Sequence, residues 1–332
     1  MRVFVAALAL LLPAAAQAAT LEVGPGRAFD RPSAAAAKAQ AGDTVTIAPG
    51  EYFDCAVWRA DNLTIVGESG GTGVTITDDA CDGKAGFVID GSGITIRNIT
   101  FARMRVPDDN GAGIRDEARD LTVQDSRFVN DQVGILGSTA SGGFLRVIGC
   151  TFRQNGVSLN GRTNFSVIAG GYALVRIERS DFAEARAGGH IAISAERMEL
   201  VGDRLADEGG HMTGPMVTVT GGALLLQDNT VEIAPGAALR PGVVLATGDV
   251  TSLELRGNTL REPAGTVPLL RNWTGQPVTQ SGNTVPPGVA VASDVGATYH
   301  RLRATAARFR DALHELYRRA RHMAAVVVHG MT

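Results

Sequence analysis

Lysine is almost absent from this chain of 332 residues, with only Lys38 and Lys84, so arginine supplies nearly all of the basic charge. The formal net charge of −3 is too weak to argue for a nucleic-acid partner. Tryptophan and tyrosine are scarce, and cysteine occurs three times. After the N-terminus no stretch is long and apolar enough for a membrane-spanning helix. The sequence therefore favours neither a nucleic-acid-binding protein nor an integral membrane protein.

Glycine, in contrast, is abundant at 41 copies. It has no triplet period, which excludes a collagen-like chain. Glycine this frequent is typical of a fold with many short strands and tight turns.

The N-terminus has the pattern of an export signal. Arg2 precedes the apolar run Val3–Leu12, and Ala16-Gln17-Ala18 fits a signal-peptidase site. We expect residues 1–18 to be a signal peptide and the mature protein to be periplasmic or extracellular. The alternative is an uncleaved membrane anchor.

One phrase of eight residues recurs roughly every 23–30 positions, a period typical of repeat architectures. Its copies are ITIRNITF from Ile94, LTVQDSRF from Leu121, LRVIGCTF from Leu145, VRIERSDF from Val175, MELVGDRL from Met198, LLLQDNTV from Leu224, LELRGNTL from Leu253 and VTQSGNTV from Val278. Positions one, three and eight are apolar in most copies, as expected where alternate strand residues face a core.

Position six of the phrase holds small polar residues in most copies: Ile99, Ser126, Cys150, Ser180, Asp203, Asn229, Asn258 and Asn283. Such a column predicts a hydrogen-bonded ladder from coil to coil. Cys150 falls in this column, which favours a small buried turn residue over a reactive thiol.

A second short apolar strand accompanies each phrase, at Gly113, Gly134, Val157, Ile191, Val217 and Val243. With no long helix between the strands, the pattern excludes a doubly wound α/β fold and predicts a solenoid of stacked parallel strands. It resembles the right-handed parallel β-helix of the pectin-lyase-like superfamily. We therefore predict an all-β fold with the β-helix over residues 44–286.

Both ends of a solenoid need covering. Residues 19–43 are predicted to form an N-terminal cap that contains a short helix. Residues 287–332 are predicted to form a linker and a basic amphipathic helix, which would dock on the last coil or contact an anionic membrane surface. Cys55 and Cys81 lie about one repeat apart, so a disulfide between neighbouring coils is expected.

Within the superfamily, the chain is similar to a group of secreted bacterial β-helix repeat proteins. The matching segments are Asp54–Trp58, Ala80–Lys84, Val106–Arg115 and Gly189-His190 followed by Ser194. That group has a lysine and an arginine beside the serine, where this chain has Ile193 and Ala195. A histidine and a tyrosine near Thr163 and Ser166 are also missing. The resemblance thus implies weakened catalysis.

The densest polar cluster is Asp108, Asp109, Asn110, Arg115 and Asp116. Oxygen ligands close together suit Ca²⁺, with Asp108 and Asp109 as metal ligands. Arg115 is expected to point outward, where it would pair with a sugar carboxylate. In the simpler interpretation, Asp-Asp-Asn-Gly is only a turn.

His190 and Ser194 are expected to share the exposed face of a strand whose isoleucines point inward. His190 would then act as a general base beside Glu196 or Asp207, unless it is an inert surface histidine. Coil stacking would place this strand two or three coils from Arg115.

Two functions follow. In the first, the chain binds and processes an acidic polysaccharide as a lyase or epimerase, with Arg115 and His190 as catalytic residues. Asp108, Asp109, Asn110, Asp116 and Ser194 would bind the substrate, and Ca²⁺ would be the one cofactor. In the second, it is a non-catalytic envelope or surface protein. A monomer is expected in both.

Overall fold

The computed structural model describes residues 18–294 apart from 138–141, 157, 160–161, 209–211, 213, 236–238, 240 and 263–266. The predicted signal peptide, up to residue 17, and the predicted C-terminal helix lie outside the described residues. No helix among the described residues is long and apolar enough to cross a bilayer.

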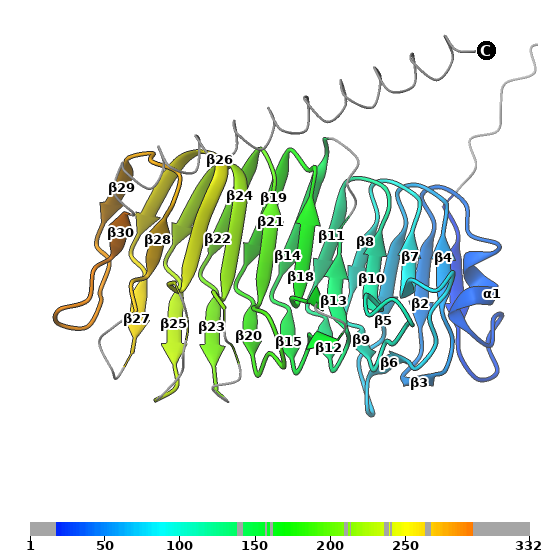
Figure 1. The fold of residues 1–332 in the computed structure, drawn as a ribbon. Coiled ribbons are helices and arrows are strands. Elements are labelled where there is room, and N and C mark those ends of the chain that lie inside the picture. Colours follow the sequence, from blue (N-terminus) through cyan, green and yellow to red (C-terminus); the bar gives the residue numbers. More distant parts are fainter. Residues whose placement is uncertain are drawn as a thin grey trace, which may run out of the picture.

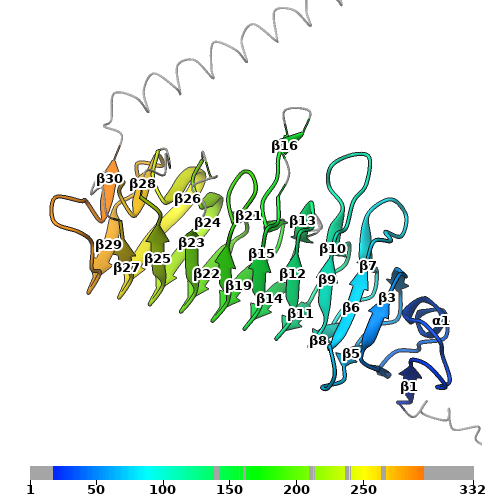
Figure 2. The ribbon, with the colours of Figure 1, turned by 90° about the horizontal axis from the view of Figure 1, so that it is seen from below.

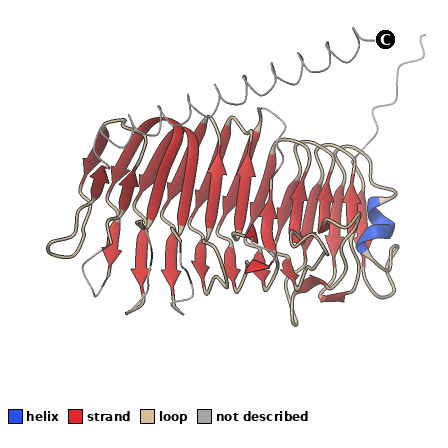
Figure 3. Cartoon of the chain, in the orientation of Figure 1, coloured by secondary structure: helices blue, strands red, loops and turns tan. Residues whose placement is uncertain are grey.

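The described chain winds into a parallel β-solenoid whose coils have three faces (Figure 1). This all-β architecture is consistent with the predicted right-handed β-helix. Helix α1 (Pro32–Ala36) lies at the N-terminal end of the solenoid (Figure 3). It spans five residues, and Asp54 Oδ2 accepts the backbone N–H of Ser33 at 2.8 Å.

Face A carries the strands of the phrase and three strands that precede them in the chain, each paired in parallel with its neighbours in the adjoining coils. The three preceding strands are β1 (Thr20–Val23), β2 (Thr44–Ile47) and β5 (Thr64–Gly67), and the phrase strands are β8 (Thr95–Arg97), β11 (Leu121–Gln124), β14 (Phe144–Ile148), β19 (Leu174–Glu178), β22 (Arg197–Val201) and β29 (Val278–Ser281).

Face B carries the short strands that follow the phrase turn. They are β3 (Gly50–Tyr52), β6 (Val74–Thr77), β9 (Thr100–Ala102), β12 (Arg127–Val129), β15 (Thr151–Arg153), β20 (Asp181–Ala183), β23 (Arg204–Asp207), β25 (Thr230–Ile233) and β27 (Thr259–Arg261).

Face C closes each coil. Its strands are β4 (Ala56–Trp58), β7 (Ala85–Ile89), β10 (Ala112–Asp116), β13 (Val133–Leu136), β18 (Val167–Gly170), β21 (Ile191–Ser194), β28 (Leu270–Asn272) and β30 (Ala292–Asp294). Two long strands, β24 (Val217–Gln227) and β26 (Val244–Arg256), each pass from face C to face A. Strands therefore extend from Thr20 to Asp294, beyond the predicted repeat range.

One predicted strand has a different role. Ser158–Leu159 (β16), expected in face C, instead pairs antiparallel with Arg162–Thr163 (β17). The hairpin projects from the body of the solenoid (Figure 2). β18, which begins at Val167, takes the face C position in that coil.

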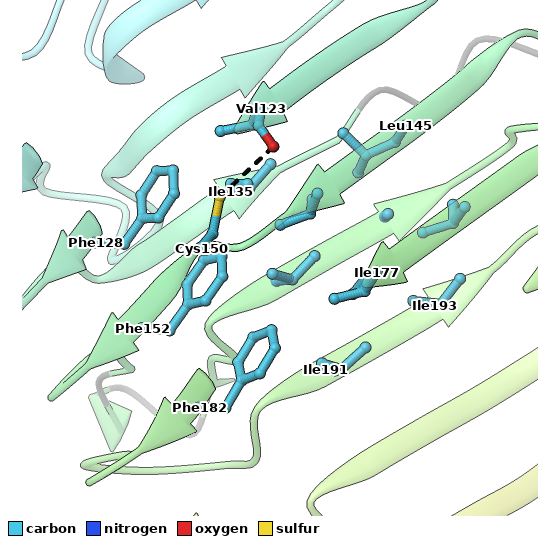
Figure 4. Close-up of a cluster of buried hydrophobic side chains, with 14 of the residues drawn as sticks. Val123, Phe128, Ile135, Leu145, Cys150, Phe152, Ile177, Phe182, Ile191 and Ile193 are labelled. Carbon is cyan, nitrogen blue, oxygen red and sulfur yellow. Dashed lines mark hydrogen bonds between the residues drawn. The ribbon is translucent and has the colours of Figure 1, made fainter. Parts of the chain in front are cut away.

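The predicted core columns are confirmed. Leu121 and Val123 pair with Leu145 and Val147 in the next coil, and all four are fully buried. Position eight forms a stack in which Phe128 lies 4.8 Å from Phe152, centroid to centroid, and Phe152 lies 4.4 Å from Phe182 (Figure 4).

The position-six ladder is also confirmed. The side chain at this position accepts the backbone N–H of its counterpart in the preceding coil. Asn229 Oδ1 accepts from Asp203 at 2.8 Å, and Asn258 Oδ1 accepts from Asn229 at 3.0 Å. Cys150 is buried in the column, and its thiol lies 3.5 Å from the carbonyl of Val123 (Figure 4). Burial raises the pKa of this thiol to about 12, as expected for an inert residue.

The predicted disulfide is present between Cys55 and Cys81, 26 residues apart. It joins the segment before β4 to the segment before β7, and these two strands are neighbours in face C.

Candidate functional site

A small apolar cluster, separate from the main core, lies along face C. Its buried members are Ala85, Val88, Ala112 and Val133, and Val57, Leu136 and Ile168 pack against it half-buried. Strand register aligns Val57, Val88, Arg115, Leu136 and Ile168 as neighbours in successive coils. Because Ile114 and Ile135 of the same strands belong to the core, alternation places this column on the outer surface.

Arg115 is the one charged residue among these apolar neighbours. Its side chain is 28% exposed, in agreement with the predicted outward orientation. Its Nε atom is buried without a hydrogen bond, and Glu117 Oε1 lies 3.4 Å away. Glu117 also accepts from Lys84 at 2.8 Å. Two cations thus share one carboxylate, which leaves this patch with an excess positive charge.

The loop before β10, which holds Asp108, Asp109 and Asn110, is a structured turn. Asp109 is buried with φ +59°, a left-handed conformation that aspartate tolerates better than most residues. Gln132 Oε1 accepts the backbone N–H groups of both Val106 and Gly111, each at 2.8 Å. This side chain closes the loop from the next coil.

The same contacts decide how well the loop suits Ca²⁺. Asp108 is exposed, whereas Asp109 is buried and accepts a hydrogen bond of 3.3 Å from Gln132 Nε2. Asn164 Nδ2 donates to the backbone carbonyl of Asp109. Within the described ranges, no group of three or more His, Cys, Asp or Glu side chains is placed to hold a metal ion. Asp108 and Asp109 as Ca²⁺ ligands therefore stay a prediction.

Asp116 is not on the surface, contrary to the prediction. It is fully buried, and its Oδ2 atom accepts a hydrogen bond of 2.5 Å from the hydroxyl of Tyr172. Burial raises the pKa of Asp116, and the bond from Tyr172 opposes that rise. Since Ile114 points inward, strand alternation alone would have placed Asp116 inward as well.

The predicted exposure of His190 is also wrong. Its side chain is fully buried, its ring tilts against Phe182 at 5.7 Å, and Nε2 lies 2.9 Å from the carbonyl oxygen of Ala206. The alternation fails because β21 begins at Ile191, so His190 belongs to the preceding turn. Burial lowers the pKa of His190 to about 4, and a neutral ring without access to solvent cannot act as a base for a surface substrate.

Ser194 is exposed, as predicted, and lies at the corner between faces C and A. It borders an open groove of about 520 Å³, together with Glu196, Tyr172, Gly221 and Thr251. Register puts β21 three strands from β10, so Ser194 lies roughly 14 Å along the solenoid from Arg115 at about 4.8 Å per strand. The structure thus brings neither Ser194 nor His190 next to Arg115.

The sequence analysis missed Lys84, Glu117 and Gln132 as partners of the candidate residues. Glu117 could have been found from the sequence, because it lies two positions after Arg115 and residues two apart in an extended chain lie on the same face. Lys84 and Gln132 come from neighbouring coils, and their contacts depend on loop geometry that the repeat pattern does not specify.

No family model matches this chain, and no curated protein matches it either. Several solved structures do match this chain. An alginate lyase from Paenibacillus sp. is 13% identical with a TM-score of 0.52, covering 84% of this chain and 98% of its own. A pectate lyase is 11% identical with a TM-score of 0.50, covering 82% and 81%. A pectin methylesterase from Aspergillus niger is 13% identical with a TM-score of 0.48, covering 85% and 92%.

The three-faced coils define a parallel β-solenoid. Its fold is that of the alginate and pectate lyases to which the chain is similar. At this identity the likeness concerns the fold alone, and any activity has to be argued from the residues of face C.

Proposed function

We propose that this chain is an exported protein that binds an extended acidic polysaccharide along the outer surface of face C. The observation that carries the proposal is Arg115, a partly exposed guanidinium set in an apolar column and sharing Glu117 with Lys84. A uronate carboxylate would form a bidentate pair with the guanidinium of Arg115, either in place of Glu117 or beside it. The half-buried Leu136 and Ile168 offer apolar surface to the C–H faces of the adjoining sugars.

Three further facts support the proposal. The disulfide fits an oxidising compartment outside the cytoplasm. The alginate and pectate lyases with this fold are named for acidic polysaccharides. A long face of stacked parallel strands also suits a linear polymer better than a small molecule.

We propose binding without turnover as the activity, because the general base predicted for a lyase or epimerase is inside the core. His190 is fully buried, and face C has no second histidine among its described strands. The chain would then be an envelope or surface protein that holds the polymer. Ca²⁺ would act, if it takes part, as a bridge between the polymer and the exposed Asp108.

Binding is tested by titrating the protein with polyuronates of both guluronate–mannuronate and galacturonate type, with and without Ca²⁺. Arg115→Ala should weaken affinity by about 10- to 100-fold, since hydrogen bonds between charged groups contribute about 1.5–3 kcal/mol. The matched control is Arg97→Ala, an exposed arginine on β8 of face A. Equal affinity of the wild type and Arg115→Ala would contradict the proposal.

Turnover is tested on the same polymers by the ultraviolet absorbance of unsaturated sugar ends. Binding with no such product supports the non-catalytic function. Product that disappears in Arg115→Ala but persists in Arg97→Ala would instead establish a lyase.

A further inference from the structure

Two arginines from different coils converge on one amide at the corner between faces B and C. Arg105 Nη2 donates to Asn130 Oδ1 at 2.5 Å, and Arg186 Nη1 donates to the same oxygen at 2.6 Å. Arg105 is held further by the carbonyls of Met104 and Asn130, and Arg186 reaches Gln154 Oε1 at 3.4 Å. All of these acceptors are neutral, so both guanidinium charges stay uncompensated.

Another arginine of the same corner shows the contrast. Arg103 donates to both Asp78 and Glu51, with N–O distances of 2.6 and 2.9 Å. Neither Arg105 nor Arg186 has a carboxylate within 4.0 Å among the described residues. The corner therefore holds one neutralised arginine and, beside it, a pair that lacks a counter-charge.

The acidic residues near Arg105 and Arg186 do not supply the missing negative charge. Asp131 is the nearest acidic influence on Arg105, but it is fully buried, and burial raises its pKa to about 8. Its carboxyl is thus largely protonated at neutral pH. Glu184 is engaged with Gln154 Nε2 at 2.8 Å. Burial lowers the pKa of Arg105 most, and the charge of Arg186 lowers it further; Asp131 opposes them only in its ionised form.

We propose that Arg105 and Arg186 form a binding site for an oxyanion, either a sulfate or carboxylate group on a glycan or the free inorganic ion. Both guanidinium groups are on exposed residues and retain N–H donors beyond those that Asn130 and Gln154 use. A tetrahedral or planar oxyanion placed between them would accept from both and offset their mutual repulsion. This site is separate from Arg115 and does not depend on the proposed function of face C.

The test uses the full-length mature protein and inorganic sulfate, followed by sulfated and uronate oligosaccharides of equal length. Affinity is measured by calorimetric titration at pH 7 and constant ionic strength, with chloride as the competing anion. Wild-type protein should bind sulfate, and Arg186→Gln should weaken that binding by about tenfold or more. Arg127→Gln, an exposed arginine on β12 of face B, is the matched control and should bind as the wild type does.

Asn130→Asp provides a second variant that keeps the shape of the side chain. Aspartate tolerates the left-handed backbone of this position, φ +60°, and would place a carboxylate against both arginines, which offsets part of their charge. It should weaken sulfate binding by about tenfold or more while leaving the fold intact, as judged by an unchanged or higher Tm. Retention of sulfate binding in both Asn130→Asp and Arg186→Gln would overturn the inference.

The arms of the experiment separate the ligand sources and the two sites. Tighter binding of a sulfated or uronate oligosaccharide than of sulfate identifies a glycan group, whereas equal affinity identifies the free ion. Loss of polymer binding in Arg115→Ala but not in Arg186→Gln would support face C as the polymer site, and the arginine pair is then judged by sulfate binding alone. Sulfate binding that depends on Arg186, without any polymer binding, would support the arginine pair and contradict the function proposed for face C.

Discussion

Two buried aspartates lie in columns where a neighbouring coil has asparagine: Asp203 in the position-six ladder, before Asn229, and Asp131 in a second ladder, before Asn155. Asp203 Oδ1 accepts the N–H of Ser180, and Asp131 Oδ1 accepts the N–H of Met104. The other oxygen of each carboxyl is buried without a hydrogen bond. At the equivalent position Asn155 Nδ2 donates to the carbonyl of Phe128, and register makes Phe101 the counterpart carbonyl for Asp131. A carboxyl can donate there only when it is protonated.

Asp131→Asn should therefore stabilise the protein, and more so as pH rises. Burial raises the pKa of Asp131 to about 8, above its ordinary value of 3.8, so the folded state holds a proton that the unfolded state has released. The stability from this group is full below about pH 4 and is lost as pH rises to about 8. Asparagine supplies a permanent donor, and we expect a gain of about 1–3 kcal/mol at pH 8.

The measurement is urea denaturation at pH 4, 6 and 8. The gain should shrink towards pH 4, and the exposed Asp108→Asn serves as the control. A gain that is equal at all three pH values would contradict protonation of Asp131. Asp203, whose pKa is raised to about 7 by burial, should show the same trend when it is changed to asparagine.

At the scale of elements, the stacked rings of face B provide the clearest packing prediction. Phe152 is fully buried between Phe128 and Phe182. Phe152→Ala should lower the free energy of unfolding by about 3–5 kcal/mol, because it removes the ring and leaves a cavity. Phe53→Ala is the control, since Phe53 is 67% exposed and should change stability little. Similar losses in the two variants, measured by urea denaturation, would exclude the stack as a major source of stability.

The strand columns could be predicted from sequence, whereas the turns could not. Leu121, Val123 and Phe128 recur at fixed positions of a phrase, and parallel pairing with a period of two follows from that recurrence alone. His190 was misplaced because alternation was extended one residue beyond the start of β21. Side chains in a turn do not alternate between two faces, so the burial of a turn residue depends on the path of the loop.

The candidate site shows the same division. The outward position of Arg115 follows from alternation within β10, and the structure agrees. The partnership of Arg105 with Arg186 was not predictable, because the residues are 81 positions apart by number and meet through Asn130 of a third segment. Contacts between corners of different coils depend on loop conformation, which the repeat leaves free.

At the scale of the whole molecule, the solenoid makes stability nearly local. Apart from the hairpin of β16 and β17, each described strand pairs with the equivalent strands of the coils before and after it, so few contacts transmit a disturbance along the axis. The disulfide between Cys55 and Cys81 fastens the first coils alone. It should stabilise that end by about 3 kcal/mol through the loop it closes, while the coils around β24 and β26 depend on their own long strands.

Reduction of this disulfide should therefore loosen one end of the molecule and spare the other. We expect faster amide hydrogen exchange in β4 and β7, whose preceding segments hold the two cysteines, and unchanged exchange in β24 and β26. The measurement is exchange mass spectrometry with and without a reductant, and Cys150→Ser excludes effects of the third cysteine. Uniform acceleration over all strands would show that the coils unfold as a single cooperative unit. Protection that fades with distance from Cys81 would instead give the range over which one coil supports the next.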